Sequence, residues 1–311
     1  MKSVEINNCP ACGSKNVQKH FIVSKSGFMS IPGFNHSLCN HCKTVFLNPR
    51  PNENELKEFY LSEKTESDVN SDIVMNSIDR VVDPIKLDYF IKNRVNPVAE
   101  FLNKDSNIFD IGCGTGAFIK AMQNSGFDKI KGCDLSEVSV KGGKKHLSLA
   151  DEDIYIGGIY DLPDEKYDLI TAWTVIEHLL NPGEFLDYVY SKLHEKGFLL
   201  LEFPTADSLM FEYFPEDFQW IMPPYHINLF SKSGINSLIQ KHGFEIRKTH
   251  LMPKNWGFFE VLSKKANLDK SLKKAILDQS PEFVFNLDSF FDKLSLKENK
   301  TSAIQIICSK I

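Results

Sequence analysis

The chain has 311 residues, enough for one large α/β domain and a smaller satellite. Hydrophobic residues make up 42% and charged residues 25%, which is typical of a globular protein with a sizeable core and excludes a disordered chain. The formal net charge of −5 and the pI near 6.0 provide no overall attraction to a polyanion, and so disfavour nucleic acid as a partner.

The ends and apolar segments of the chain indicate neither secretion nor membrane insertion. The first residues, MKSVEINNCPACG, lack the apolar run of a secretory signal. Apolar stretches such as residues 198–201 are far shorter than the roughly 20 residues that cross a bilayer. We therefore expect no membrane span and a cytoplasmic location. Of the seven cysteines, four stand in two close pairs, which favours a metal site over a disulfide framework.

Residues 1–51 are predicted to form a small zinc-binding module. Two C-x-x-C pairs, separated by 26 residues, supply four thiols: Cys9, Cys12, Cys39 and Cys42. Two such pairs complete a closed tetrahedral shell with no open position for water, as in a structural zinc site. His36 and His41 are alternative ligands that the site does not need. Because the module has few large apolar residues, the metal would contribute much of its folding free energy.

The charge of residues 1–50 differs from that of the whole chain. This segment carries six Lys or Arg residues and a single acid, Glu5. A zinc ion held by four thiolates would add two negative charges. The basic character that remains is compatible with an acceptor molecule that carries phosphate.

Residues 52–102 show apolar residues at helical spacing and are predicted to be a helical lead-in to the domain that spans residues 103–311. In that domain, short apolar runs alternate with helical patterns, at 108–111, 117–125, 130–134, 137–149, 154–156 and 167–172. Continuous apolar strands separated by helices indicate a parallel sheet covered on both faces. The predicted fold class is therefore α/β and Rossmann-like.

The second half of this domain contains a long aromatic segment. Residues 204–230 are rich in aromatic residues and proline and follow a predicted strand, which is where a substrate lid would sit. The flanking elements are predicted from the same periodicities: a helix at 182–194, a strand at 198–203, a helix at 231–242, a strand near 244–249, charged helices within 265–299 and a strand at 303–308.

The strongest functional signal is the sequence DIGCGTG, which runs from Asp110 to Gly116. It follows the predicted strand 108–111 directly and precedes a helical pattern. Glycines in this position let the backbone turn sharply and approach a ligand closely, while the next helix offers free N–H groups at its N-terminus. The spacing is G-x-G-x-G after an acid, and it differs from the G-x-G-x-x-G pattern of dinucleotide binding.

This motif resembles that of the class I S-adenosylmethionine-dependent methyltransferases, and the resemblance implies a seven-stranded sheet and S-adenosylmethionine as cofactor. Asp134 ends the second strand, where the family places the acid that binds both ribose hydroxyls. Gly158 and Ile159 fall where the family contacts adenine, although most relatives carry an acid at the position of Gly158. The predicted cofactor-binding residues are Asp110, Gly112, Cys113, Gly114, Thr115, Gly116, Asp134, Leu135, Gly158, Ile159 and Trp173.

Zinc knuckles followed by NPRP at residues 48–51 and a class I core resemble a narrower group, the methyltransferases of sugar and surface-polysaccharide pathways. Its best-known branch methylates carbon atoms of nucleotide-activated keto-deoxysugars. The segment YHINLFS at 225–231 matches the family's histidine-containing segment. That branch carries Glu-His there, whereas Tyr225 precedes His226 in this chain, which leaves O-methylation of a sugar or glycan equally open.

Methyl transfer to a hydroxyl requires a general base near pH 7, and histidine has the appropriate pKa. His226 is the first candidate and His178, in the sequence VIEH, is the second. Tyr225 would act as an orienting group or as a proton relay. Trp220, in the aromatic segment, could line the acceptor site, as could Trp173.

Two other acceptor classes stay open at this point. Small-molecule O-methyltransferases of the quinone type share the same core motifs. Some ribosomal RNA methyltransferases join a zinc ribbon to this core, but the acidic balance of the chain argues against RNA. A scaffold without turnover is disfavoured because the acid and glycine positions of the cofactor motif are intact.

Overall fold

The computed structural model describes residues 3–24, 31–62, 69–253 and 258–311. Residues 63–68 of the predicted helical lead-in and 25–30 of the predicted zinc module lie outside the described residues. Within the described ranges, no helix combines the length and apolarity that a membrane span requires.

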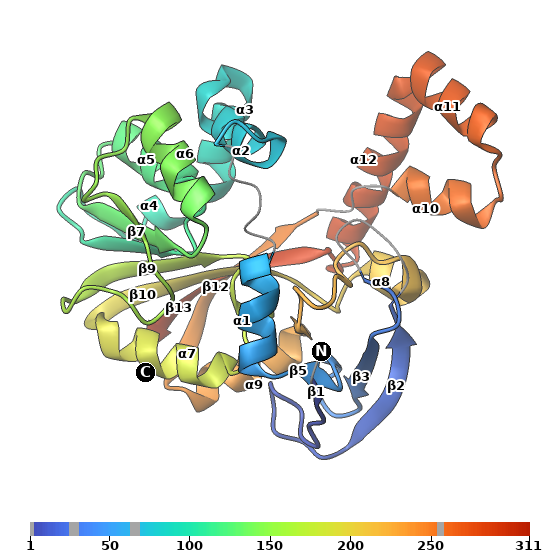
Figure 1. The fold of residues 1–311 in the computed structure, drawn as a ribbon, viewed down its shortest axis with the longest axis horizontal. Helices are drawn as coiled ribbons and strands as arrows, with labels where there is room; N and C mark the ends of the chain where they lie inside the picture. Colours follow the sequence, from blue (N-terminus) through green and yellow to red (C-terminus); the bar gives the residue numbers. More distant parts are fainter. Residues whose placement is uncertain (1–2, 25–30, 63–68, 254–257) are drawn as a thin grey trace.

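A seven-stranded sheet forms the centre of the molecule (Figure 1). Its strands in spatial order are β12 (Phe244–Met252), β13 (Ala303–Lys310), β10 (Leu193–Pro204), β9 (Tyr167–Trp173), β6 (Ile108–Ile111), β7 (Ile130–Asp134) and β8 (Ile154–Ile156). All neighbours pair in parallel except β13, which runs antiparallel to both β10 and β12. The parallel strands place their carboxyl ends at one edge, where ligands of open α/β sheets bind.

Helices cover both faces of this sheet and confirm the predicted fold class. Side chains of β6 alternate between the two faces: Ile108 belongs to one buried cluster and Phe109 to the other. The face of Ile108 is covered by α2 (Asp72–Val82), α3 (Pro84–Phe90), η2 (Ile91–Val95), α4 (Asn96–Ala99), α5 (Ala117–Asn124) and α6 (Glu137–Leu147). The opposite face is covered by α7 (Pro182–Lys192) and α9 (Lys232–Lys241).

The predicted strands at 108–111, 130–134 and 154–156 have the observed bounds, but the helix predicted at 182–194 ends two residues early. Leu193 already pairs with Tyr167 of β9 and is buried in the sheet. Residues 193–194, which the helical pattern assigned to the helix, therefore belong to the sheet. Pairing with a buried strand outweighs their local helix propensity.

The N-terminal module contains two small sheets. One pairs β1 (Ser3–Val4) with β5 (Arg50–Pro51), and α1 (Glu53–Ser62) follows. The other has the order β11-β4-β3-β2, in which β2 is Val17–Val23, β3 is Asn35–Cys39 and β4 is Val45–Leu47. Its edge strand β11 (Asn228–Leu229) comes from the aromatic segment, more than 180 residues further along the chain. The module is thus joined to the large domain by backbone pairing.

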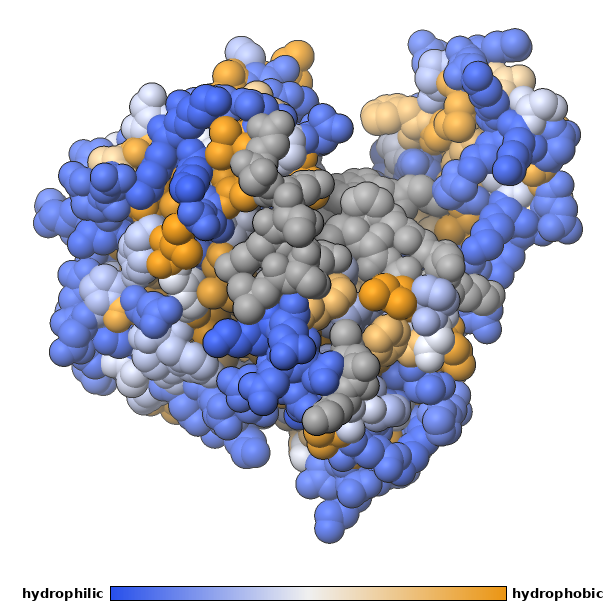
Figure 2. Space-filling view, viewed as in Figure 1, coloured by the Kyte–Doolittle hydropathy of each residue, from blue (hydrophilic) through white to orange (hydrophobic). Residues whose placement is uncertain are grey.

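The aromatic segment is more ordered than a loop, since it contains α8 (Leu209–Tyr213) and the short helix η4 (Pro215–Asp217) before β11. Between β12 and β13 the chain forms α10 (Phe258–Lys265), α11 (Lys270–Gln279) and α12 (Pro281–Lys297), which project from the body (Figure 1). Figure 2 shows hydrophobic residues at the surface of this projection. The most exposed are Phe285 at 73% and Phe290 at 63%.

Candidate functional site

The glycine-rich turn lies between the carboxyl end of β6 and the start of α5. Gly112, Gly114 and Gly116 have φ values of 68°, 58° and 73°, in the left-handed region that favours glycine. A Cβ at Gly116 would lie 2.4 Å from the side chain of Leu149. Nothing lies within 4 Å of the equivalent position at Gly114. The backbone at Gly114 is therefore open to close approach by a ligand.

Two further residues of the motif face inward. Cys113 is 9% exposed, and burial raises the pKa of its thiol well above the usual value. The hydroxyl oxygen of Thr115 lies 2.8 Å from that of Ser77 on α2, so the helical lead-in is attached to the turn.

Asp110 is a buried acid with one uncommitted oxygen. Its Oδ1 accepts a hydrogen bond of 2.6 Å from the Thr171 hydroxyl, whereas Oδ2 has no hydrogen-bond partner among the described residues. Burial raises the pKa of Asp110 to about 7, against the opposing effects of the Thr171 hydrogen bond and the nearby charge of Arg94. A cationic ligand group beside Oδ2 would stabilise the ionised carboxylate.

Asp134, at the end of β7, connects that strand to the glycine turn. Its Oδ2 accepts a hydrogen bond of 2.8 Å from the Gly114 N–H, and its Oδ1 accepts one of 2.7 Å from the Ser136 N–H. Each carboxylate oxygen can accept a second hydrogen bond. Both oxygens thus accept a backbone hydrogen bond, and the binding of two ribose hydroxyls by Asp134 stays a prediction.

Beside Gly158, the predicted adenine-contact position, lies an acid that the sequence motifs did not indicate, Asp161. Gly158 donates its N–H to Asp161 Oδ2 at 2.7 Å, and the Asp161 N–H returns a hydrogen bond of 3.1 Å to the Gly158 carbonyl. Leu135 lies beside this turn and is 57% exposed. Ile159 packs partly buried against the core. The spacing G-x-x-D at residues 158–161 could have predicted this contact, because it closes a turn that brings the carboxylate back to Gly158.

Trp173, predicted as a cofactor contact, ends β9 with a buried indole. Its ring lies 4.2 Å from the guanidinium carbon of Arg94 and packs edge-on against Phe118. Arg94 in turn donates to Glu202 Oε1 at 2.7 Å, and Gln305 Nε2 donates to Glu202 Oε2 at 2.8 Å. The pair of Arg94 and Glu202 joins residues 108 positions apart, so no local pattern reveals it.

The two candidate histidines lie together. His178 ends the short helix η3 (Ile176–His178) just after β9, and its ring centroid is 4.8 Å from that of His226, with the planes at 77°. The Nδ1 of His178 lies 2.9 Å from the Tyr225 carbonyl, and the Nδ1 of His226 lies 2.9 Å from the Trp220 carbonyl. Since a carbonyl only accepts, both Nδ1 atoms carry the proton, which leaves Nε2 of His226 as the acceptor nitrogen of that ring.

Burial keeps both imidazoles neutral at pH 7. It lowers the pKa of His178 to about 4 and, together with the nearby His178, lowers the pKa of His226 to about 3. Glu177 is fully buried, and its carboxylate, with one nitrogen from each ring, forms a group whose donor atoms lie within 4.8 Å of one another. Such a group can hold a proton network or a divalent cation. Tyr225 contributes its carbonyl here, while its ring packs on Phe59.

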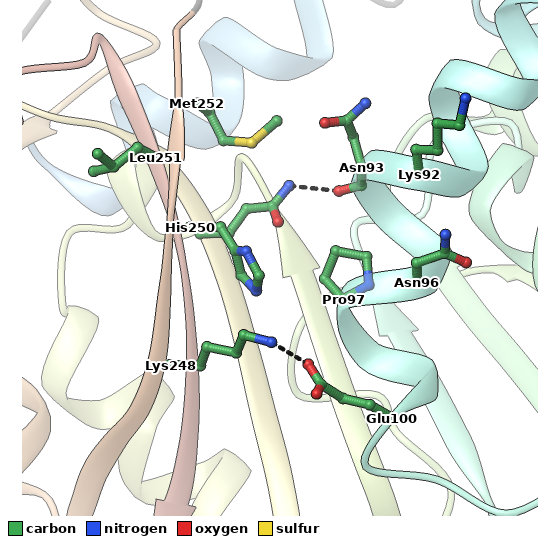
Figure 3. A pocket seen from close by; sticks show the side chains of 10 residues that line it. Lys92, Asn93, Asn96, Pro97, Glu100, Lys248, His250, Leu251 and Met252 are labelled. Atoms are coloured by element: carbon green, nitrogen blue, oxygen red, sulfur yellow. Dashed lines mark hydrogen bonds and ion pairs between the residues drawn. The ribbon is translucent and has the colours of Figure 1, made fainter. Parts of the chain in front are cut away.

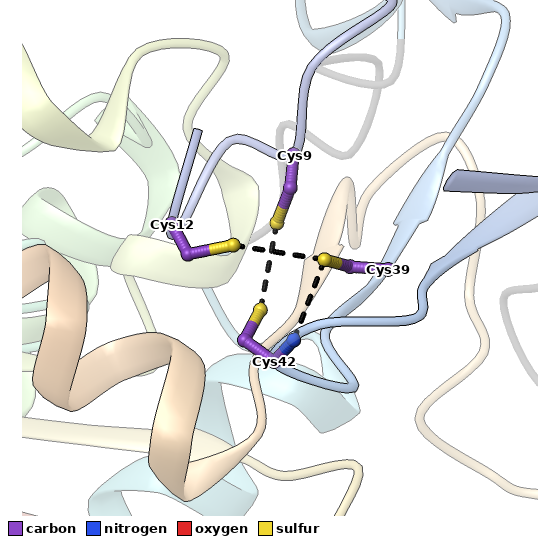
Figure 4. A group of neighbouring side chains, drawn as sticks. All are labelled: Cys9, Cys12, Cys39 and Cys42. Atoms are coloured by element: carbon purple, nitrogen blue, oxygen red, sulfur yellow. Dashed lines mark hydrogen bonds between the residues drawn. The ribbon is translucent and has the colours of Figure 1, made fainter. Parts of the chain in front are cut away.

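The four predicted metal ligands converge in the N-terminal module (Figure 4). The Cys9 and Cys42 sulfurs are 3.6 Å apart, as are those of Cys12 and Cys39. Sulfurs around a tetrahedral zinc with bonds of about 2.3 Å stand roughly 3.8 Å apart, so the geometry suits one such ion. His36 lies in β3 outside this cluster, and burial lowers the pKa of its ring to about 4.

A cavity of about 310 Å³ lies between the η2–α4 segment and β12 (Figure 3). It is lined in part by His250 and by the ion pair of Lys248 with Glu100. None of its lining residues is a predicted cofactor, catalytic or metal-binding residue. It is therefore distinct from the site at the glycine turn.

Comparison with known families identifies the domain built around this site. The model of a family described as "Methyltransferase domain" matches residues 85–249, just over half of the chain. The chain belongs to this methyltransferase family. The match includes the glycine turn, Asp134 and His178, but it ends before the last strand and excludes the four-cysteine module.

Curated relatives match only part of the chain. A ribosomal protein L11 methyltransferase of Clostridium botulinum (strain Eklund 17B) is 31% identical over 131 residues, which covers 35% of this chain and 42% of the relative. A mitochondrial ubiquinone biosynthesis O-methyltransferase of Candida albicans is 30% identical over 149 residues, which covers 42% of this chain and 46% of the relative. The chain thus spans less than half the length of these methyltransferases.

Among solved structures, a SAM-dependent methyltransferase from Archaeoglobus fulgidus aligns with 71% of this chain and 94% of its own. The TM-score is 0.46 and the sequence identity is 18%.

Proposed function

We propose that this protein transfers a methyl group from S-adenosylmethionine to a sugar, nucleotide-sugar or glycan acceptor. The main support for this cofactor is the open glycine turn. It is flanked by two carboxylates, Asp110 and Asp134, at the carboxyl ends of β6 and β7. Asp134 would bind the ribose hydroxyls, and the uncommitted Oδ2 of Asp110 suits a cationic part of the cofactor. Gly158, Ile159 and Leu135 would border the adenine.

The acceptor class rests on the sequence resemblance to sugar-pathway methyltransferases and on the basic character of residues 1–50. The position of the histidine segment next to the four-cysteine module supports the same reading, because that module accompanies the group that the sequence resembles. A quinone-type small molecule is the second candidate, favoured by the partial similarity to the ubiquinone biosynthesis O-methyltransferase. RNA is third, since the net charge of −5 does not attract it.

The four cysteines are proposed to hold one structural zinc ion. Three of the four are buried, at 2% exposure for Cys9, 0% for Cys39 and 1% for Cys42, and the shell has no open position for a substrate. The ion would stabilise the module and make no direct contact with the reacting groups.

His226 is proposed as the general base. S-adenosylmethionine supplies, when bound, a methyl group already activated on its sulfonium sulfur. The protein must then align the acceptor atom and, for a hydroxyl, remove its proton. The Nε2 of His226 is the nitrogen that would accept that proton, and burial makes it a weaker base than an exposed histidine. His178 holds the segment through the Tyr225 carbonyl.

The deciding experiment is calorimetric titration of the zinc-loaded protein with S-adenosylmethionine and S-adenosylhomocysteine. We expect micromolar affinity that Asp134→Ala abolishes, because the carboxylate both holds the glycine turn and binds the ribose. Turnover would then be screened on nucleotide-sugars, quinones and RNA. His226→Ala should retain cofactor affinity and lose about 10²-fold in turnover, as expected for a lost general base. No cofactor binding by the well-folded protein would refute the proposal.

A further inference from the structure

The segment that carries His226 is held between the four-cysteine module and the large domain. On one side, the Ile227 N–H donates to the Glu177 carbonyl at 2.9 Å. On the other side, the Leu47 N–H of β4 donates to the Ile227 carbonyl at 2.8 Å. The single residue after His226 therefore bridges the module strand and the turn that bears His178.

Pairing of β11 with β4 continues this connection. Asn228 stands opposite Phe46, and Leu229 opposite Val45. The side chain of Asn228 donates to the Leu179 carbonyl at 2.7 Å, so the same two segments are tied a second time. Because these groups are buried, each broken bond would leave an uncompensated polar group.

The turn that holds Cys39 and Cys42 is the second cysteine knuckle. The strand β4 begins three residues after Cys42 and continues directly from this knuckle. The knuckle closes on itself, since the Lys43 N–H donates to the Cys39 carbonyl at 2.8 Å and the Cys39 N–H donates to the Thr44 carbonyl at 2.9 Å. A metal held by Cys39 and Cys42 would fix the direction in which β4 leaves this turn.

The start of α9 rests on the same knuckle. Ser231, the N-cap of α9, donates its hydroxyl to the Cys42 carbonyl and accepts from the Gly234 N–H at 2.9 Å. The Ser231 N–H donates to the Thr44 hydroxyl at 3.3 Å. A Cβ at Gly234 would lie only 2.0 Å from the Thr44 oxygen and 3.2 Å from the Cys42 sulfur. The start of α9 and the knuckle are therefore in direct contact, just after β11.

We infer that Thr44 and Ser231 are positioning residues that couple the metal-held knuckle of Cys39 and Cys42 to the placement of His226. The inference rests on the proposed function, in which His226 is the base. The Ile227 carbonyl and the strand β11 bond to β4, and Ser231 bonds to the knuckle through Thr44 and Cys42. Movement of the knuckle would therefore displace the histidine segment. Release of the metal would then disorganise the histidine segment. The glycine turn is not held by these bonds, so it would still bind cofactor.

The test compares Thr44→Val and Ser231→Ala with Ser233→Ala, an exposed serine two residues further along α9. Thr44→Val removes the hydroxyl that accepts from the Ser231 N–H and lies 3.4 Å from the Cys42 sulfur, while the cap bond between Ser231 and the Gly234 N–H stays in place. Ser231→Thr should rescue Ser231→Ala because it restores both the cap and the donor. Zinc content, S-adenosylhomocysteine affinity, kcat and KM would be measured for each, together with the imidazole NMR signals of His178 and His226.

We expect Thr44→Val and Ser231→Ala to retain one zinc per chain and unchanged cofactor affinity, but to shift the imidazole signals and lower kcat by about 10-fold to 10²-fold. The double variant should lose less than the product of the two single losses, because both act on one contact. Unchanged imidazole signals and kcat in both well-folded variants would overturn the inference. If Ser231→Ala does not fold, Thr44→Val decides. Failure of wild-type protein to bind cofactor would refute the proposed function, whereas the NMR signals would still report on the coupling.

Discussion

Individual residues at this site owe their properties to burial. Asp110 and His226 are both withdrawn from water, yet their pKa values move in opposite directions, because burial disfavours whichever form is charged. His226 is thereby neutral across the physiological range, and its imidazole is a weaker base than the ordinary histidine pKa assumed from the sequence implies. Asp110, with a pKa near 7, changes its charge within that range.

The pKa of Asp110 predicts how cofactor affinity depends on pH. Above pH 7 the carboxylate is ionised and attracts a cation, whereas below pH 7 it is protonated and neutral. Affinity for S-adenosylmethionine should therefore weaken as pH falls below 7, by up to about 10-fold per pH unit. Calorimetric titration from pH 5.5 to 8.5 measures this dependence.

Asp110→Asn is the matched control, because the amide keeps the shape of the carboxyl group and cannot ionise. This variant should bind S-adenosylmethionine more weakly, and its affinity should no longer change with pH through the titration of residue 110. A wild-type affinity that stays constant across this range would show that Asp110 does not face the cationic part of the cofactor.

At the scale of elements, two adjacent glycines explain how α6 packs against the glycine turn. Glycine inside a helix costs about 1 kcal/mol relative to alanine, so Gly142 and Gly143 look unfavourable from sequence. In the structure, a Cβ at Gly143 would lie 2.1 Å from the Thr115 carbonyl oxygen, and one at Gly142 would lie 2.5 Å from a methyl group of Val74. The glycines permit close approach of α6 to the turn and to α2.

Gly143→Ala should therefore destabilise the protein and weaken cofactor binding, despite the better helix propensity of alanine. The new methyl group meets a backbone carbonyl, which can move only with the glycine turn, and overpacking of this kind costs about 1–3 kcal/mol. Thermal unfolding and S-adenosylhomocysteine titration check this expectation.

Gly142→Ala serves as the comparison, since its neighbour is a side-chain methyl group of Val74, which can shift more easily than a backbone carbonyl. It should be milder in both measurements. Equal effects of the two variants would mean that close approach to the Thr115 carbonyl does not matter for the turn.

At the scale of the whole molecule, the four-cysteine module is part of the main structure. Cys9, Cys39 and Cys42 belong to the same buried cluster as Phe203 of β10 and Ile235 of α9. The backbone pairing of β4 with β11 adds to this packing. Loss of the metal is thus expected to affect the stability of the large domain as well as that of the module.

Calorimetry should show one unfolding transition for the zinc-loaded protein, and removal of zinc should lower its midpoint by on the order of 10 °C. The reason is that loss of a structural metal removes several kcal/mol of folding free energy from a unit that unfolds together with the rest. Addition of zinc should restore the midpoint.

Two separate transitions would contradict this expectation and indicate an independently folding module. Metal analysis of the same samples should give one zinc per chain. A second bound ion would instead assign a metal to Glu177, His178 and His226, whose donor atoms also lie close together.

The parts of this protein that follow from sequence are those encoded in neighbouring residues. The strand at 108–111, the glycine turn after it and the C-x-x-C pairs depend on backbone conformation and spacing within a few positions, so local pattern predicts them. The order of these motifs also predicted the sheet, because alternating strands and helices have few alternatives to a parallel arrangement.

Only the tertiary structure decided the contacts between distant segments. It brought His226 beside His178, placed β11 in the sheet of the module and paired Arg94 with Glu202. Such contacts depend on how whole layers pack, and a residue carries no local mark of a partner 48 to 184 positions away. The sequence by itself therefore determined the fold class and the candidate ligands, and packing determined which of them meet.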